Sequence, residues 1–329
     1  MSNKLIKYFG IKTLENKYNL SIEYKCFESV TLKNLEKSLN TSKMLSKQSI
    51  VSDVVYSYNL YFGGSQANKV AEGAKGCVEI TIYNHNNLLN DPKYANIVNI
   101  HSEEGCNISS NLSKGVGTLH MINTALNVCI KMFPWVMFFT FSDTSTKECI
   151  TKKPSSSVSL SAFMIALYGK TWYEKNFKAT LLKQSEQIEY CQKLEKFNDS
   201  KLKNKISWEL FYNRFIINFG RNSNIINIDI IYNLYINTKT FREFLDKLQF
   251  EIKDKQQLCL TLQPWIESFV LFLLGDGNLD TIASLNSTLS KQWIIDISGV
   301  SEIEFDKPGI VILDSIEYTG GNDSGYKIL

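Results

Sequence analysis

The sequence predicts an α/β (α+β) protein with a mixed central sheet flanked by helices, a mainly helical C-terminal extension and a strand-rich tail. Three observations support this prediction. Short runs of β-branched and aromatic residues alternate with helical stripes of apolar residues across residues 78–177. Long, charged segments with helical spacing fill residues 181–274. Strand-like alternation then returns from Trp293 onward.

Length and composition are those of a folded globular protein. The chain has 329 residues, of which 44% are hydrophobic and 21% charged, so wholesale disorder is not expected. We predict a core domain over residues 1–180 and an extension over residues 181–329. The 36 Lys and Arg are interleaved with the 33 Asp and Glu, and the net charge is only +3. The basic footprint of a nucleic-acid-binding protein is therefore missing, and no nucleic-acid partner is expected.

The cysteines and histidines predict neither a disulfide framework nor a metal site. The seven cysteines are odd in number, scattered and mostly set in apolar stretches, which is typical of free thiols in a reducing compartment. No Cys-x-x-Cys pair occurs, and the three histidines lack the spacing of paired ligands. The most apolar stretches, residues 129–141 and 265–274, are shorter than the ~20 residues of a membrane span. No membrane span is therefore expected.

The middle third of the chain reads as one βαβα unit. Strands are expected at residues 78–83 and 96–101, and an irregular segment ending in glycines leads into a helix over residues 118–130. Residues 136–141 form a continuous apolar run, which is typical of a strand buried on both faces. Residues 160–168 then carry an amphipathic helical stripe. This order is that of a layered α/β fold.

The two ends of the chain give weaker patterns. Leu32, Leu35 and Leu39 have helical spacing, and residues 50–61 resemble a strand. Whether the first sixty residues join the central sheet stays open. The further elements expected after Phe177 are helices over residues 181–197, 207–219, 240–250 and 258–274, and strands over residues 293–297 and 310–316.

A glycine-containing segment between a strand and a helix is the strongest functional signal. It reads Lys114, Gly115, Val116, Gly117 and Thr118. Glycines at such a turn allow close backbone approach, and the free N–H groups of a helix start favour a phosphate. The same glycines also serve simple turn geometry, so this segment alone leaves both interpretations open.

A second segment makes the sequence resemble a known superfamily. Residues 169–177 read Gly-Lys-Thr-Trp-Tyr-Glu-Lys-Asn-Phe and follow the second amphipathic helix. Together with Gly115 and Gly117, Tyr173 and Phe177 resemble the glycine loop and the later aromatic ending of the GNAT acyltransferases. The resemblance is strongest to acetyltransferase-like proteins of large cytoplasmic DNA viruses. Two positions depart from the family pattern: Leu112 replaces a Gln or Arg, and Asn176 replaces a glycine that ends a helix in the left-handed conformation.

The resemblance implies a GNAT-like central sheet, an acetyl-coenzyme A cofactor and an amine substrate. The pyrophosphate would rest on the amides of Lys114 to Thr118, and Tyr173 would be the acid that protonates the thiolate. The base is left open among Glu103, Glu104 and Asp143, with His101 acting through water as a fourth possibility.

Two functions follow from the resemblance. The first is a cytoplasmic coenzyme A-dependent N-acetyltransferase that acts on a small-molecule or protein amine. The second is a catalytically inactive viral protein of the same fold, in which the C-terminal region binds protein partners in a virion or a host complex. Fold-level resemblance does not by itself decide between them.

Overall fold

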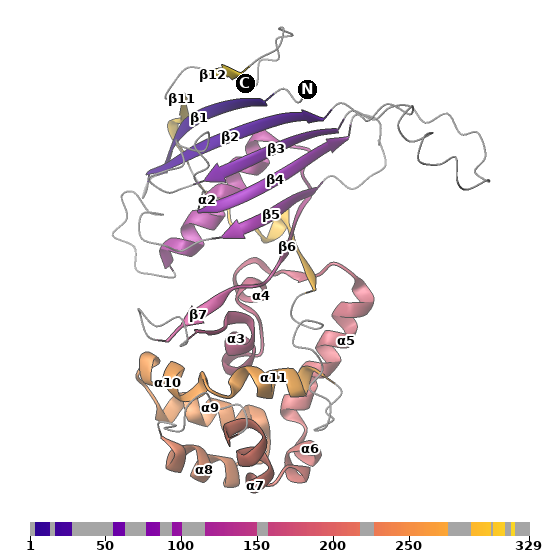
Figure 1. Ribbon diagram of the computed structural model, residues 1–329, viewed down its shortest axis with the longest axis vertical. Helices are drawn as coiled ribbons and strands as arrows, with labels where there is room; N and C mark the ends of the chain where they lie inside the picture. The colour runs from indigo at the N-terminus through magenta and orange to yellow at the C-terminus, as the bar shows by residue number, and fades with distance from the viewer. Residues whose placement is uncertain are drawn as a thin grey trace, which may run out of the picture. The chain divides into compact units, whose positions relative to one another are not determined.

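The strand expected at residues 78–83 lies in the middle of a mixed sheet in the computed structural model (Figure 1). The structure describes residues 4–13, 17–27, 55–62, 77–85, 94–100, 116–149, 157–217, 227–275, 291–303, 305–312 and 317–319. The predicted helix around Leu35 lies outside these residues.

The chain divides into two compact units, and the division differs from the one predicted. The first unit contains Met1–Phe141 and Ile295–Leu329, and the second contains Ser142–Ile294. The predicted boundary at residue 180 is therefore not where the chain separates, because the helices that follow residue 157 pack with the later helices. The strand-rich tail belongs to the first unit, since β11 (Phe305–Ile312) pairs with the first strand of the chain.

The first unit is built on a five-stranded antiparallel meander that begins at the N-terminus. Each strand pairs with the next, so the first sixty residues do contribute to the central sheet. Its strands are β1 (Lys4–Thr13), β2 (Lys17–Phe27), β3 (Val55–Phe62), β4 (Val78–His85) and β5 (Tyr94–Ile100). At the edge, β1 pairs with β11 and with β12 (Glu317–Thr319).

The meander continues through one helix into a parallel strand. Helix α2 (Val116–Met132) packs against β4 and lies behind the strands in Figure 1. It leads to β6 (Phe138–Ser142), which pairs parallel with β5. Both elements were predicted, and their order confirms the α/β character of the fold and the mixed sheet.

One face of this sheet is apolar and forms the core of the first unit. Ile80, Ile82 and Ala95 alternate along β4 and β5 and are buried. From α2, Ile122 and Leu126 are buried as well. Because side chains alternate across a strand, the residues between these apolar positions lie on the opposite face.

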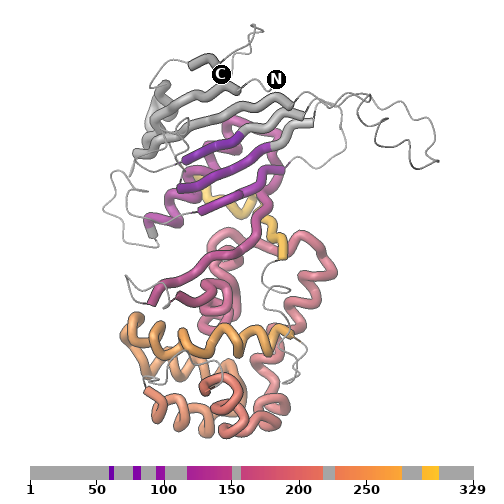
Figure 2. Tube along the Cα trace, viewed as in Figure 1, coloured from indigo at the N-terminus to yellow at the C-terminus, as the bar shows by residue number. Residues whose placement is uncertain are grey.

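The second unit is mainly helical, as the sequence predicts for most of its length (Figures 1 and 2). A hairpin of β7 (Thr146–Glu148) and β8 (Ser157–Ser159) precedes the helices, and β9 (Thr180–Leu181) pairs with β10 (Gln292–Asp296). The first helices are α3 (Leu160–Tyr168), α4 (Trp172–Phe177), α5 (Gln184–Leu194), η3 (Glu195–Asn198) and α6 (Ser200–Lys205). The later ones are α7 (Trp208–Phe211), the π-helical turn η4 (Tyr212–Ile217), α8 (Ile228–Ile236), α9 (Phe241–Glu251), α10 (Lys255–Leu262) and α11 (Ile266–Leu274).

An aromatic core holds these helices together. Phe211 is fully buried, and its ring lies 4.5 Å from Tyr235 and 5.4 Å from both Trp265 and Phe269, centroid to centroid. Such ring pairs add to the large apolar area that each aromatic side chain buries. Arg242 joins α9 to α3, since its guanidinium donates to the carbonyl oxygens of Ala166 (2.6 Å) and Ile165 (3.0 Å).

Two helix ends differ from expectation. The single helix predicted over residues 258–274 is two helices, α10 and α11, bent by 64° at a break that contains Pro264. The left-handed residue that ends α4 is Lys178 rather than Asn176. Asn176 lies within the helix, where its amide donates to the Trp172 carbonyl oxygen (2.8 Å).

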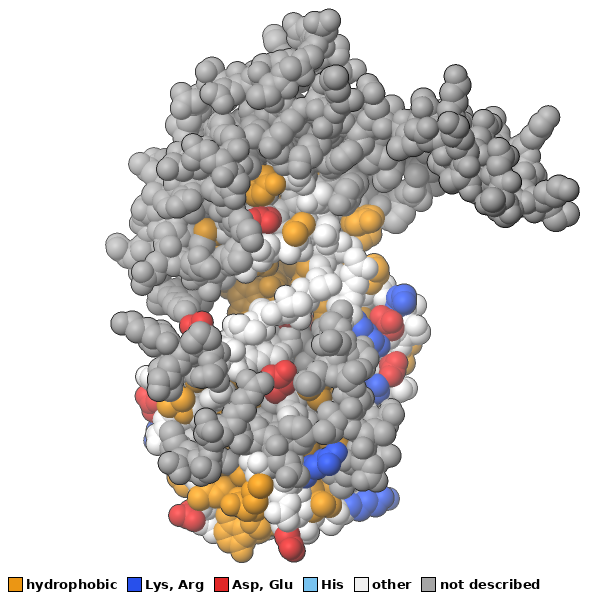
Figure 3. All heavy atoms as spheres, viewed as in Figure 1, with side chains coloured by type: hydrophobic (Ala, Val, Ile, Leu, Met, Phe, Trp, Pro, Cys, Tyr) orange, Lys and Arg blue, Asp and Glu red, His pale blue; other side chains and the backbone are white. Residues whose placement is uncertain are grey.

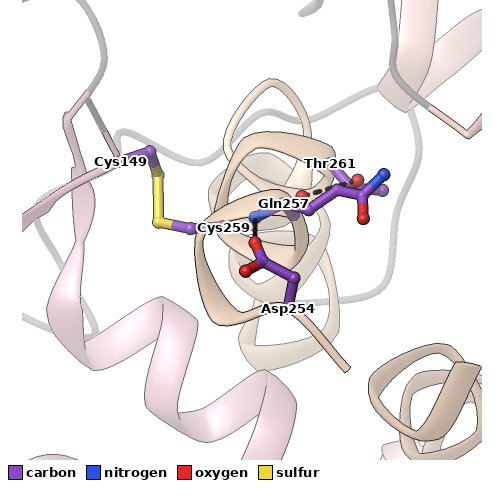
Figure 4. Close-up of a disulfide and its surroundings, with 5 residues drawn as sticks. All are labelled: Cys149, Asp254, Gln257, Cys259 and Thr261. Atoms are coloured by element: carbon purple, nitrogen blue, oxygen red, sulfur yellow. Dashed lines mark hydrogen bonds between the residues drawn. A yellow bond between two sulfur atoms is a disulfide. The ribbon is translucent and has the colours of Figure 1, made fainter. Parts of the chain in front are cut away.

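The prediction of free thiols is wrong for three cysteines. Cys149, after β7, forms a disulfide with Cys259 of α10, with a Cα–Cα distance of 5.4 Å (Figure 4). Cys77 is disulfide-bonded as well. Among the described cysteines, Cys129 and Cys191 are free. Because disulfides persist mainly in oxidising environments, the cysteines no longer support the expectation of a reducing compartment.

The described helices bear on the expectation that the chain has no membrane span. None of them alone is long and apolar enough to cross a membrane, although the bent pair of α10 and α11 meets the length and composition criteria together. Most apolar side chains of α11, including Ile266, Phe269 and Leu273, are buried within the fold.

Candidate functional site

Strands β5 and β6 pair only along their first residues. Tyr94, Ala95 and Asn96 face Phe138, Phe139 and Thr140 in the parallel register, and the pairing stops there. In the described strands, residues 97–100 of β5 have no partner in β6. The two strands therefore separate toward their carboxyl ends, which is the edge where ligands bind in open α/β sheets.

The N-terminus of α2 lies at this same edge. The helix connects β5 to the parallel strand β6, and a helix that makes such a crossover begins on the side of the strands' carboxyl ends. Val116, Gly117 and Thr118 form its first turn, which carries no acidic residue. The backbone N–H groups and the positive end of the helix dipole therefore suit an anionic phosphate group.

A β-bulge marks β5 where the strands begin to diverge. The register between β4 and β5 shifts between Glu79 and Ile80, because Glu79 faces Asn99 whereas Ile80 faces Ile97. Val98 is the extra residue, and its side chain is 56% exposed. Bulges bend a strand and redirect its side chains, and they are frequent beside functional sites.

The face of the sheet opposite the apolar core is lined by polar side chains. Cross-strand partners share a face, and two rows of such partners cross β3, β4 and β5; one of these rows continues to Thr140 of β6. Within these rows Thr81 donates a hydrogen bond to Asn59 (2.8 Å) and Thr140 donates one to Asn96 (3.2 Å). We call this surface the polar face; it consists of Asn59, Tyr61, Glu79, Thr81, Asn96, Asn99 and Thr140.

Glu79 is the acidic residue among these seven, and Glu23 of β2 lies opposite Asn59 in the neighbouring row. The Glu79 side chain is half-buried, and its Oε1 atom is fully buried without a hydrogen-bond partner. No cation among the described residues forms an ion pair with it. A buried carboxylate oxygen without a partner costs free energy, because it gives up hydration and gains nothing in return. Such a cost in a folded protein is a reason to look for a ligand.

Asp143, one of the predicted bases, has a structural environment. One carboxylate oxygen accepts hydrogen bonds from the backbone N–H (3.1 Å) and the hydroxyl of Ser145, and the other accepts one from the Ser161 hydroxyl. The side chain is 8% exposed. These bonds fix the turn after β6 to the first turn of α3, so we do not retain Asp143 as a base.

Tyr173, the predicted acid, lies in the same unit as Asp143. Its ring is buried and packs with Trp172 and Phe177, at centroid distances of 5.0 and 6.4 Å. Burial raises the pKa of the Tyr173 phenol far above its usual value, and the charge of Asp143 raises it further. The phenol is therefore protonated at neutral pH, which an acid requires, although its raised pKa makes it a weaker proton donor.

The structure thus separates the predicted site residues into two groups. Val116, Gly117 and Thr118 belong to the first unit, whereas Asp143 and Tyr173 belong to the second. Glu103, Glu104, Lys114, Gly115 and His101 lie outside the described residues.

Glu79 was not among the predicted site residues, although its position in the sequence places it on the polar side of a strand. Val78, Ile80 and Ile82 were assigned to one face of a strand, which places Glu79 and Thr81 on the other. A carboxylate on the solvent face of a strand is common, and only the structure reveals that one of its oxygens is buried without a partner.

In the described part of the chain, no group of three or more His, Cys, Asp or Glu side chains lies close enough together to bind a metal ion. Comparisons with protein-family models, curated proteins and solved structures give no match to this chain.

Proposed function

We propose that this protein is a coenzyme A-dependent N-acyltransferase whose acyl donor binds at the edge between β5 and β6. The observation that supports the proposal is the parallel pair that separates after Asn96 and Thr140, with the first turn of α2 at the same edge. A pantetheine arm needs a narrow groove between backbones, and diverging strands expose the backbone groups that could bind it. The resemblance in the glycine segment agrees with this placement.

The bound donor would supply an activated thioester. The residues of this chain would hold its pyrophosphate through the N–H groups of Val116, Gly117 and Thr118. The amine nitrogen attacks the carbonyl carbon, the C–N bond forms, and the C–S bond breaks with its electron pair going to sulfur. The ammonium loses one proton before attack and a second as the amide forms, and the thiolate takes up one proton.

Replacing Thr118 by Glu tests the donor site. The added carboxylate would lie in the first turn of α2, where it repels a pyrophosphate but interacts favourably with the helix dipole. We expect the dissociation constant of acetyl-coenzyme A to rise at least about tenfold, while the melting temperature stays the same or rises. Isothermal titration and thermal unfolding of the full chain measure the two quantities.

Thr118→Gln is the matched control, since it adds the same bulk without the charge. We expect it to bind acetyl-coenzyme A nearly as tightly as the unmodified protein does. If both variants bound acetyl-coenzyme A equally weakly, the bulk of the new side chain rather than its charge would be the cause of the lost affinity. No binding by the unmodified protein would refute the proposal.

A second candidate function, also expected from the sequence, is protein binding without catalysis. Figure 3 shows hydrophobic side chains gathered over α7 and α8 of the second unit. The exposed apolar residues of these two helices include Leu210 (37%) on α7 and Tyr232 (41%) and Ile236 (51%) on α8. Exposed apolar side chains that lie together are typical of interaction surfaces. This function becomes the leading one if acetyl-coenzyme A does not bind.

A further inference from the structure

We propose that the exposed face of α7, η4 and α8 binds an amphipathic helix of a partner protein, one that presents Lys or Arg beside its apolar side chains. The inference does not depend on acyl transfer; it rests on the second candidate function and names the chemistry of its partner. It is carried by a stripe of exposed residues on α8, by the aromatic rings beside that stripe and by two exposed carboxylates.

The exposed residues of α8 have the spacing of a helix–helix contact. Asp229, Tyr232 and Ile236 are exposed and follow one another at three and four residues, which places them on one side of the helix. Ile231 and Tyr235, on another side of α8, are buried in the second unit. Apolar side chains repeated at three and four residues are the pattern with which one helix packs along another. Helix α8 therefore has a second apolar side, at the surface, that a further helix can cover.

Aromatic rings join α8 to α7 beside this stripe. The Trp208 ring lies 5.2 Å from Tyr232 and 5.5 Å from Tyr212, centroid to centroid. Trp208 and Tyr212 are half-buried, so their rings are held by neighbours and still reach the solvent. The helix also changes from α to π at Tyr212, and such turns are rare but frequent at functional sites. Tryptophan and tyrosine are enriched among the residues that dominate binding energy at protein interfaces.

The carboxylates of this face lack partners. Glu209 of α7 and Asp229 of α8 are exposed, and neither forms an ion pair with another described residue. Arg214 of η4 is two residues beyond Tyr212, and residues two apart on a helix do not share a face, so its side chain does not lie with Trp208 and Tyr212 toward α8. Figure 3 shows acidic side chains at the border of the hydrophobic ones, whereas Lys and Arg side chains lie over α6.

These carboxylates decide between the occupants that an apolar face can have. The same face of a second copy would bring like charges together, which opposes association, and an anionic lipid surface would be repelled. A Lys or Arg side chain of a partner instead pairs with either carboxylate and gains further when it lies over the ring of Tyr232. A basic amphipathic helix therefore fits the face best.

The test uses two synthetic amphipathic helices on the full chain, one built from leucine and lysine and the other from leucine and glutamate. Each has about 18 residues, enough to be helical, with leucine at three- and four-residue spacing, so the two differ only in charge. Fluorescence anisotropy measures the dissociation constant of each labelled peptide. We expect the lysine helix to bind at least about tenfold more tightly than the glutamate helix, and less tightly as salt is added.

Two serine variants test the apolar part of the face. Ile236→Ser removes an apolar contact, and Ile188→Ser is its matched control, because Ile188 on α5 is exposed to a similar extent (53% against 51%). We expect Ile236→Ser to weaken binding of the lysine helix at least about fivefold and Ile188→Ser to leave it unchanged. Neither should change the melting temperature appreciably, since both side chains already contact water.

Asp229→Lys tests the charge. We expect this variant to bind the lysine helix less tightly and the glutamate helix more tightly than the unmodified protein does. Asp229 also lies in the first turn of α8, where the helix dipole favours a carboxylate, so the melting temperature is expected to fall slightly. A purely structural role for Asp229 would weaken the binding of both helices instead of shifting the preference, and would overturn the inference.

The remaining outcomes separate this inference from the proposed functions. Preference for the glutamate helix would keep protein binding as a function and overturn the inference alone, and binding of neither helix would overturn the inference as well. A dimer in sedimentation velocity that Ile236→Ser dissociates would assign the face to a second copy. Binding to phosphatidylserine vesicles that Ile236→Ser removes would assign it to a membrane, and either result would overturn the inference. Titration of the same protein with acetyl-coenzyme A decides the acyl-transfer proposal independently.

Discussion

Replacing Cys149 and Cys259 together by alanine is expected to lower the free energy of unfolding of the second unit by about 4 kcal/mol. The bridge joins residues 110 positions apart, and closing so long a loop removes much conformational freedom from the unfolded chain. Both cysteines are buried, so the alanines add a small loss of buried contacts. Urea unfolding followed by tryptophan fluorescence measures the change, because four of the five tryptophans lie in this unit: Trp172, Trp208, Trp265 and Trp293.

Cys191→Ala is the control for this double variant. Cys191 is exposed and free, so its replacement is expected to change the free energy of unfolding by less than about 0.5 kcal/mol. A double variant as stable as the unmodified protein would contradict a bridge between β7 and α10. Intact mass measured without reductant gives an independent check, because each disulfide lowers the mass by two hydrogens.

Replacing Lys203 by methionine is expected to stabilise the protein at pH 7 and to leave it little changed near pH 10. The Lys203 ammonium is buried in the second unit, where it donates to the Tyr235 carbonyl oxygen (3.1 Å) and lies 3.4 Å from the centre of the Tyr235 ring. Burial lowers the pKa of Lys203 from 10.5 to about 8. At neutral pH the folded protein therefore pays for burying a charged group.

The sign of the pH dependence follows from the two pKa values. Between about pH 8 and pH 10.5 the unfolded chain binds more protons at Lys203 than the folded protein does, so stability rises with pH across this window. Below it both states hold the proton, and the burial cost, on the order of 2 kcal/mol, is present in full. The Lys203→Met variant does not bury a charge and so lacks that cost. The Tyr235 carbonyl oxygen, which loses the Lys203 hydrogen bond in this variant, still accepts one from the Thr238 hydroxyl (3.2 Å).

Urea unfolding at pH 7, 8.5 and 9.5 measures the free energy of unfolding of the unmodified protein and of Lys203→Met. The comparison stays below pH 10 because burial raises the pKa of Tyr235, and ionisation of tyrosine in the unfolded chain destabilises the fold above that pH. Lys203→Arg is a useful control, since a guanidinium stays charged throughout and should show no rise with pH. If the difference in free energy of unfolding between the unmodified protein and Lys203→Met stayed constant from pH 7 to 9.5, the lowered pKa of Lys203 would be contradicted.

Much of the central fold could be predicted because its signals are local. Alternating Val78, Ile80 and Ile82 specified β4, and the helical stripe of Ile122 and Leu126 specified α2. Strands β1 and β2 were missed because their residues mix charges with apolar side chains in an irregular order. Their place at the edge of the sheet depends on pairing across long sequence distances, as between β1 and β11. The boundaries of the two units depend on the same long-range contacts.

The candidate site was only partly visible in the sequence. The helix start at Val116 to Thr118 was predicted, since glycines between a strand and a helix are a local signal. Asp143 was considered a base because it follows a buried strand, but the hydroxyls of Ser145 and Ser161 occupy its oxygens. Glu79 was not predicted because the burial of one of its carboxylate oxygens without a partner is a property of the three-dimensional structure, which no spacing rule conveys.

The most direct test of the proposed donor site is amide hydrogen exchange of the full chain with and without acetyl-coenzyme A. The proposal predicts slower exchange in the first turn of α2, at residues 116–120, and in residues 97–100 of β5. It also predicts unchanged exchange in α8, α9 and α10. Unchanged exchange at residues 116–120 under saturating acetyl-coenzyme A, or slowing confined to the second unit, would contradict it.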